Sequence, residues 1–196
     1  MAFISKRSTT TPLSTPLTEK RVQTLLGTYI DHARRYDAMI PGCMVQVDSE
    51  ADMLGLRKSG FCDEFEIKLS KADFLKDRKK KVQYKAPPAW QEGEHDTFSG
   101  TQSERGSLAP WEKLKLTALA DGDMIPNYFW YVIKAGIVSK SEVPRFAGLI
   151  TVSDQGEIIV VRHPEKLHGR KLSFEQRYKF AALLNERFWA YRANGA

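Results

Sequence analysis

The stretch that decides the fold is Glu50-Ala-Asp-Met-Leu-Gly-Leu56, Arg57-Lys-Ser-Gly60, Phe61-Cys-Asp-Glu-Phe-Glu-Ile-Lys68. It predicts two neighbouring strands joined by a tight turn. Side chains alternate between the two faces of a strand, so Glu64, Glu66 and Lys68 are expected on one face, and Asp52 shares a face with Glu50. If the strands pair as a hairpin, these carboxylates and one lysine converge. Neighbouring carboxylates repel and raise one another's pKa values, and a bound cation would relieve that repulsion.

Asp52, Glu66 and Lys68 have the residue types that metal-assisted hydrolysis of a phosphate ester needs. Mg²⁺ takes oxygen ligands, usually one or two carboxylates with water and substrate phosphate, and the Ile67 carbonyl would complete such a set. The metal would polarise the phosphate and acidify a water, and Lys68 would orient that water or neutralise charge in the transition state. The plainer alternative is a solvated strand on which Glu and Lys alternate. Glu50 and Glu64 stay ambiguous between supporting carboxylates, ligands of a second metal and solvated strand residues.

The net positive charge of the chain favours an anionic binding partner. The net charge is +6 and the isoelectric point is near 9.3. Basic residues follow directly after the acidic cluster, between Lys71 and Lys85, which places bases around a central group of acids. Lys71, Arg78 and Lys79 are therefore the candidates to contact nucleic-acid phosphates. A basic helical face that is only solvated is the alternative.

The remaining pattern predicts a mixed α/β domain on a small central sheet. Residues 1–16 are rich in Ser, Thr and Pro and are expected to form a flexible tail, followed by a single domain over 17–193 in which 86–123 is an insertion or mobile loop. Helices are expected from Thr18 to near Arg35, from Ser70 to near Tyr84, over Trp111–Ala120 and after Ser173, the last with Phe174, Tyr178, Ala181, Leu184 and Phe188 on its apolar side. Further strands are expected over Cys43–Val47, Tyr128–Ile133, Ala147–Val152 and Ile158–Val161.

The amino-acid composition argues against a disordered or a membrane-spanning protein. A hydrophobic fraction of 42% argues against general disorder, and the chain has no apolar run long enough to span a bilayer and no signal-like leader. We expect a soluble, cytoplasmic protein whose Cys43 and Cys62 are reduced, ordinary residues. The four histidines have no metal-ligand spacing. The oligomeric state is open, with a homodimer as one option.

Three segments together resemble the PD-(D/E)xK nuclease superfamily, and within it the small MmcB-like DNA-repair proteins of bacteria and phages. They are the acid-containing strand at Asp52, the strand-to-helix junction Glu64-Phe-Glu-Ile-Lys-Leu-Ser-Lys-Ala-Asp-Phe74, and the pair Tyr128-Phe-Trp-Tyr-Val-Ile-Lys-Ala-Gly-Ile137 and Ala147-Gly-Leu-Ile150. The resemblance covers about residues 18–190 apart from 86–123. Ala51 stands where the superfamily has a proline.

The resemblance implies a restriction-endonuclease-like αβββαβ core with helices on both faces of the sheet. It implies that Asp52 and Glu66 bind Mg²⁺ or Mn²⁺, that Lys68 is the catalytic lysine, and that the substrate is DNA in repair, recombination or phage DNA processing. The first helix sometimes donates another acid, for which Glu19 is the candidate. Two alternatives stay open: a DNA-binding or partner-binding module of the same fold with little catalytic activity, and a basic α/β protein whose acidic cluster is structural.

Overall fold

The computed structural model describes residues 16–29, 34–46, 49–84 and 111–194. The helices and strands are α1 (Glu19–Thr28), β1 (Tyr36–Gln46), β2 (Ser49–Arg57), β3 (Cys62–Lys68), α3 (Lys71–Asp77), β4 (Lys81–Tyr84), β5 (Trp111–Leu114), α4 (Lys115–Ala120), β6 (Tyr128–Lys134), the 3-10 helix η2 (Lys140–Glu142), β7 (Gly148–Val152), β8 (Ile158–Arg162) and α5 (Phe174–Ala193).

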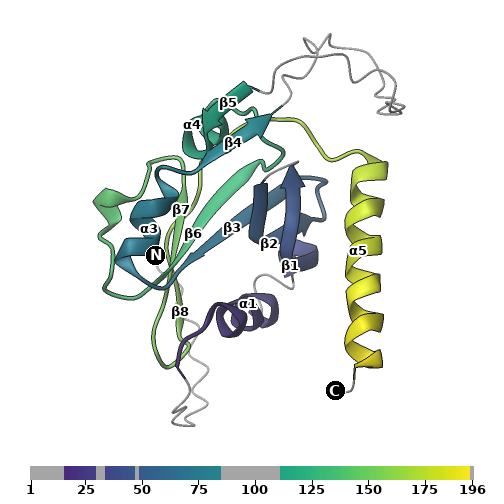
Figure 1. The fold of residues 1–196 in the computed structure, drawn as a ribbon, viewed down its shortest axis with the longest axis horizontal. Coiled ribbons are helices and arrows are strands. Elements are labelled where there is room, and N and C mark those ends of the chain that lie inside the picture. The colour runs from purple at the N-terminus through teal and green to yellow at the C-terminus, as the bar shows by residue number, and fades with distance from the viewer. Residues whose placement is uncertain (1–15, 30–33, 47–48, 85–110, 195–196) are drawn as a thin grey trace.

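A six-stranded mixed sheet of order β1-β2-β3-β6-β7-β8 organises the molecule, and β4 and β5 form a separate hairpin (Figure 1). The strands β1, β2 and β3 run as an antiparallel meander. Strands β3, β6 and β7 are parallel, and β8 returns antiparallel to β7. The α/β class is confirmed, as is the expected order of one helix, three strands and a helix. The next strand of the sheet, β6, follows only after the β4–β5 hairpin and α4.

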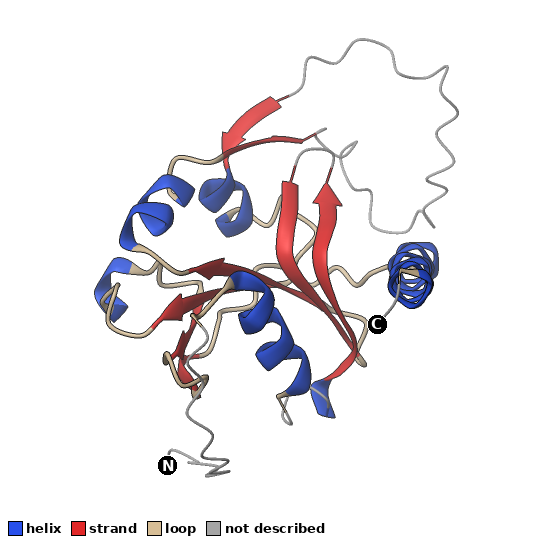
Figure 2. Cartoon of the chain, turned by 60° about the horizontal axis from the view of Figure 1, so that its bottom comes forward, coloured by secondary structure: helices blue, strands red, loops and turns tan. Residues whose placement is uncertain are grey.

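The central strands β3 and β6 are buried on both faces because helices cover both sides of the sheet. On one face α1 packs against the sheet through the cluster Val22, Leu26, Phe65, Ile67, Trp130 and Val132. On the other face α3 and α4 pack through Phe74, Ala118, Leu119, Phe129, Tyr131 and Ile133. Figure 2 shows α1 lying across its face of the sheet. The alternation along β3 therefore sends its odd-numbered residues toward α1 and its even-numbered residues toward α3 and α4.

Local sequence signals place the ends of several elements. The Thr18 hydroxyl accepts a hydrogen bond from the Arg21 amide and caps α1, and the Ser70 hydroxyl caps α3 in the same way. Ser173 and Gln176 form the expected capping box at the start of α5. Gly60 closes the β2–β3 turn with φ +88°, a conformation that glycine adopts without strain.

Four of the helices and strands expected from the sequence differ in the structure. Helix α1 ends at Thr28 rather than near Arg35, and residues 30–33 lie outside the described residues. Strand β1 begins at Tyr36, well before Cys43. The basic helix from Ser70 stops at Asp77, because residues 81–84 pair with β5. The helix expected over Trp111–Ala120 is a strand followed by the short helix α4. The tail at 1–15 and most of the expected insertion, 85–110, lie outside the described residues.

Helix α5 lies at the side of the domain next to β1 (Figure 1). The expected apolar side of this helix is wrong, because Phe174, Tyr178 and Phe188 are 85%, 65% and 53% exposed. Phe180 and Leu183 pack instead against the β1–β2 cluster, and the Arg187 guanidinium donates to the carbonyls of Pro41 and Gly42. Apolar residues occur around the whole helix, so spacing alone did not identify the packed side. Among the described residues, no helix is long and apolar enough to cross a membrane.

Replacing Gly148 by alanine is expected to destabilise the protein by about 1–3 kcal/mol through overpacking. A Cβ at this position of β7 would lie 2.3 Å from Trp130 Cε3 and 2.7 Å from Cδ2. Trp130 cannot move aside easily, since its ring stacks on Phe65 and its indole N–H donates to Asp63. Urea denaturation measures the change. Gly169→Ala is the control, because a Cβ there meets nothing within 4 Å of the described atoms; equal stability of the two variants would refute the argument.

Candidate functional site

Asp52 lies where β2 stops pairing with β3. The last paired residues are Met53 and Phe65, and beyond them the Asp52 carboxylate replaces the backbone as hydrogen-bond acceptor. Its Oδ2 accepts a hydrogen bond from the Ile67 amide at 2.6 Å. The Asp52 carbonyl accepts a second hydrogen bond from the Gln23 amide group of α1, at 2.9 Å. The side chain is therefore fixed to β3 and its backbone to α1.

Glu66 lies on the α3–α4 face of β3 and binds two lysines. Lys68 Nζ donates to Glu66 Oε1 at 2.7 Å, and Lys115 Nζ donates to Oε2 at 2.7 Å. Lys80 Nζ lies further away, 4.0 Å from Oε1. Glu66 and Lys68 are almost fully buried, and Lys115 is completely buried. Burial alone would raise the pKa of Glu66, but the surrounding lysines, Lys115 first, lower it to about 2.

Glu64 is the deepest acid of the group. It is completely buried, and Lys115 Nζ lies 2.6 Å from its Oε1. Neither carboxylate oxygen of Glu64 has a hydrogen-bond partner of good geometry among the described residues, so Lys115 contacts it as an ion pair. Burial raises the pKa of Glu64, and the positive charge of Lys115 opposes that rise only in part. Lys115 thus joins Glu64 and Glu66 in one buried ion-pair cluster.

Asp77, the last residue of α3, lies on the other side of the cluster, near Lys68. Its Oδ2 accepts a hydrogen bond from the Tyr131 hydroxyl at 2.5 Å, and its Oδ1 lies 3.9 Å from Lys68 Nζ. Asp73, on the same helix, lies 4.0 Å from Lys68 Nζ. Burial, followed by the charge of Glu66, raises the pKa of Asp77. The Lys68 ammonium is therefore surrounded by three carboxylates from two elements.

The pKa values of Asp52 and Glu66 are shifted in opposite directions. Burial, followed by the negative charge of Glu66, raises the pKa of Asp52 to about 7, although the Ile67 amide and Lys68 act in the opposite direction. The Glu66 carboxylate stays ionised because its lysines bind it directly. A cation bound next to Asp52 would favour the ionised form of this acid.

In metal-free buffer, Asp52→Asn is expected to raise the melting temperature by several degrees at about pH 8 and by much less at about pH 5. The carboxyl titrates near 3.8 when unfolded and near 7 when folded. Between these values the folded state holds more protons, so the free energy of unfolding falls as pH rises through that window. Asparagine does not titrate, and its side-chain oxygen can still accept from Ile67. Thermal melts at both pH values test this, and an equal difference at both would contradict it.

The structure brings together some of the residues proposed from the sequence. Asp52, Glu64, Glu66 and Lys68 lie in one cluster with the Ile67 backbone. Glu19 lies at its edge, because the Gln23 side chain bonds both the Glu19 carboxylate and the Asp52 carbonyl.

The other proposed residues lie away from this cluster. Glu50 is exposed on β2, and its carboxylate lies next to Gly42 of β1. Lys71 pairs with Glu142 of η2. Arg78 and Lys79 are exposed just after α3.

Sequence reasoning missed Lys115 and Asp77. Lys115 lies in the segment expected to be an insertion, where the short lengths of β5 and α4 gave no clear periodicity. Its position is fixed by its amide, which donates to the Lys80 carbonyl at the end of the β4–β5 hairpin. In the sequence, Asp77 lies inside a predicted basic helix that continues to near Tyr84, so it does not stand out. A signal for it was present: Asp73 and Asp77 are four residues apart and share a helix face.

The residues at Asp52 fit a small divalent cation with oxygen ligands. Among the described residues, no three His, Cys, Asp or Glu side chains are placed to hold a metal by themselves. Mg²⁺ needs fewer, because water and substrate supply the rest of its ligands. Asp52 Oδ1 accepts no hydrogen bond among the described residues. Each Glu66 oxygen accepts one hydrogen bond from a lysine and has a further lone pair that could bind a metal. The Ile67 carbonyl leaves β3 on the same edge as its amide, toward Asp52. Asp52, Glu66 and the Ile67 carbonyl would hold the ion.

Comparisons with known proteins give a fold likeness. A solved structure of a protein of unknown function from Silicibacter pomeroyi matches 92% of this chain and 96% of its own, with a TM-score of 0.57 and 18% sequence identity. No protein-family model matches the chain. No curated protein matches it either. At this identity the likeness shows a shared fold and says nothing about activity.

Proposed function

We propose that this protein is a Mg²⁺- or Mn²⁺-dependent nuclease of the PD-(D/E)xK type that hydrolyses DNA phosphodiester bonds. One observation carries the proposal: the Asp52 carboxylate is fixed to the Ile67 amide, between Glu66 and Lys68, so that two acids, a backbone carbonyl and a lysine meet at one point of the sheet. The topology around that point, with β3 and β6 parallel and α1 behind them, agrees with the αβββαβ core expected from the resemblance. We further propose a cytoplasmic role in repair, recombination or phage DNA processing.

Each residue of the site would have its own role in the hydrolysis. When bound, the metal would polarise the scissile phosphate and lower the pKa of a water. Asp52 and Glu66 would hold it, with Asp52 losing its proton as it binds. Lys68 would stabilise negative charge on the reacting phosphate, and Asp73 and Asp77 orient its ammonium. Arg78 and Lys79, exposed just after α3, would contact the DNA backbone outside the reacting phosphate.

One observation favours the second candidate, a DNA-binding or partner-binding module without strong catalytic activity. Both Glu66 oxygens already accept hydrogen bonds from Lys68 and Lys115. Lysines that neutralise the acids reduce the need for a metal. The two functions differ in one measurable respect, because only the nuclease requires a divalent cation to act on DNA.

The deciding experiment is cleavage of plasmid, linear, single-stranded and branched DNA with Mg²⁺ or Mn²⁺, and with EDTA as the blank. Wild-type protein is expected to cleave at least one substrate, and Asp52→Asn and Glu66→Gln to lower the rate at least about 100-fold, because each removes a metal-binding charge. Glu186→Gln, an exposed acid of α5, is the matched control and should cleave normally. Cleavage that survives both site substitutions would refute the assignment. Metal-independent DNA binding without cleavage would favour the module.

A further inference from the structure

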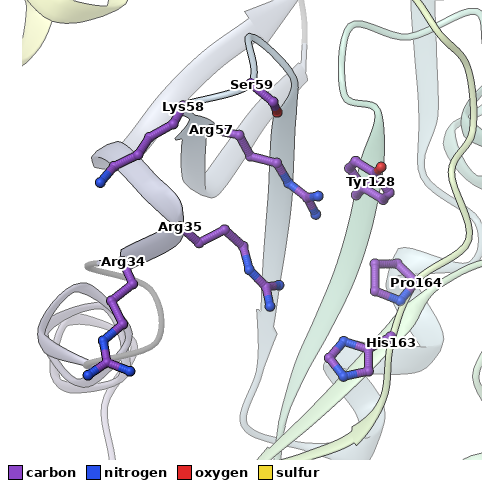
Figure 3. Close-up of a pocket in the computed structure, with 8 residues that line it drawn as sticks. All are labelled: Arg34, Arg35, Arg57, Lys58, Ser59, Tyr128, His163 and Pro164. Atoms are coloured by element: carbon purple, nitrogen blue, oxygen red, sulfur yellow. The ribbon is translucent and has the colours of Figure 1, made fainter.

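A strongly basic cavity lies at the opposite end of the sheet from Asp52. It has a volume of about 510 Å³, and its lining includes Arg34, Arg35, Arg57, Lys58, Tyr128 and His163. These residues come from the segment before β1, the end of β2 and the turn that follows it, the start of β6 and the segment after β8. Figure 3 shows Arg35 and Arg57 pointing into the space that Tyr128 and His163 border on its far side. Asp63 and Lys68 are five residues apart on β3, so the two sites are about 17 Å apart along the strand.

The positive charge of Arg57 is neutralised by the carboxylate of Asp63. Its guanidinium donates to Asp63 Oδ2 at 2.7 Å and lies 3.6 Å from the centre of the Tyr128 ring. Asp63 also accepts hydrogen bonds from the Tyr36 hydroxyl and the Trp130 indole, so both oxygens of its carboxylate are hydrogen-bonded within the protein. Arg57 and Asp63 therefore form a rigid, uncharged wall of the cavity.

The other cations of the cavity have no such partner. Within the described residues, no carboxylate lies within ion-pair distance of Arg34, Arg35 or Lys58. The charges of Arg34, Arg35 and Lys58 are therefore unpaired within the described residues. The backbone holds two of these residues together, because the Lys58 amide donates to the Arg35 carbonyl. The Arg34 and Lys58 side chains point away from the cavity, whereas the Arg35 guanidinium points into it beside that of Arg57 (Figure 3). Arg35 is therefore the unpaired cation that an anion in the cavity would meet.

We propose that this cavity is a phosphate-binding site, whose ligand carries the phosphate on a nucleotide or on a nucleic-acid strand. A guanidinium fork matches the geometry of phosphate oxygens, and the guanidinium groups of Arg35 and Arg57 both point into the cavity, where they can donate to a single group. The volume suits a nucleotide-sized ligand better than a bare ion. The site is separate from the acids at the other end of β3, so it stands whether or not the protein cleaves DNA.

The surface beside the cavity suits the strand as one source of that phosphate. Lys166 and Lys171 place their ammonium groups 4.1 and 5.6 Å from the centre of the Phe61 ring, next to the β2–β3 turn. Lysines with a partly exposed aromatic ring are the combination that single-stranded nucleic acids bind. A free nucleotide would need the cavity alone, whereas a strand would also contact these lysines.

Titration calorimetry in EDTA at low salt tests the site with three probes: inorganic phosphate, adenosine monophosphate and a short single-stranded DNA. At least one is expected to bind wild-type protein, and Arg35→Ala to weaken it by about tenfold or more, because charged hydrogen bonds are lost. Arg192→Ala, which removes the same charge from an exposed position of α5, should bind as wild type. Arg57 is left intact, since its loss would leave Asp63 buried and unpaired. Thermal melts check folding, and Arg35→Lys, which retains the charge without the fork, should recover only part of the affinity.

The three probes separate the two sources of phosphate. Binding of phosphate or of the mononucleotide identifies a free phosphate ester as sufficient, whereas binding of the oligonucleotide alone identifies a strand. Lys80→Ala should retain the binding in either case, since the partly exposed Lys80 lies near Glu66, away from the cavity. Failure of all three probes to bind, or equal binding by wild type and Arg35→Ala, would overturn the proposal.

Discussion

Replacing Lys68 by alanine is expected to lower the rate of metal-dependent DNA cleavage by about 100- to 1000-fold while leaving DNA affinity nearly unchanged. Under the proposed function, Lys68 acts on charge that develops only in the transition state, and removing one such donor typically costs this much in turnover. Its ammonium is fixed for that task, 2.7 Å from Glu66 Oε1 and within 4.0 Å of Asp73 and Asp77. Single-turnover cleavage and a separate binding assay in Ca²⁺ measure the two quantities.

Lys80→Ala is the matched control for Lys68. Lys80 Nζ also lies near Glu66 Oε1, but at 4.0 Å and on a partly exposed side chain. Its loss should change the cleavage rate less than tenfold, since a longer, solvated pair contributes little. Equal losses from both variants would show that positive charge near Glu66 matters in general and that Lys68 has no special role. Lys68→Arg would retain the charge in a different shape and should recover only part of the rate.

Lys115→Met is expected to destabilise the folded protein by about 3–5 kcal/mol near neutral pH, the usual cost of removing one partner from a buried ion pair. Lys115 is completely buried between Glu64 and Glu66, at 2.6 and 2.7 Å. Without it, Glu64 has no neutralising neighbour in contact. Urea denaturation measures the loss. The loss should shrink as pH falls, because protonated carboxyl groups no longer need the lysine.

Two further variants identify the cause. Glu64→Gln combined with Lys115→Met should recover part of the lost stability, because the amide carries no charge that needs a partner. Lys113→Met, only two residues earlier, should change the free energy of unfolding much less than Lys115→Met does, since its pairs with Asp121 and Asp123 are partly exposed. If Lys115→Met is as mild as Lys113→Met, the buried cluster contributes little to stability.

Local patterns predicted the fold well where the structure depends on neighbours in sequence. The β2–β3 hairpin, the caps Thr18, Ser70 and Ser173, and the apolar strand β6 were all visible as short-range signals. The sequence predicts too long a helix after Ser70, because Val82 continues its apolar spacing. Val82 is buried in a different element, β4, which pairs with β5 across residues 85–110. Pairing over such a distance has no local signature.

The candidate site was predictable in part for the same reason. Asp52, Glu66 and Lys68 come from adjacent strands, so alternation and one turn were enough to bring them together. Lys115 enters the site from α4, in a segment without clear periodicity, and a lysine is rarely completely buried. Only the folded arrangement shows that Glu64 and Glu66 need it. Glu50, by contrast, shares a strand face with Asp52 and is ambiguous from the sequence, and the structure places its carboxylate next to Gly42 of β1.

The two unlike faces of β3 have a consequence for how the sheet is assembled. A slip of β3 by one residue would turn Glu64, Glu66 and Lys68 toward the apolar cluster under α1, and would place Phe65 and Ile67 against Lys115. Charges would then be buried without partners, at a cost of several kcal/mol each. Misaligned pairings are therefore penalised far more than they would be between two uniformly apolar strands. The charge cluster selects one register of the central strand, whatever chemistry it also performs.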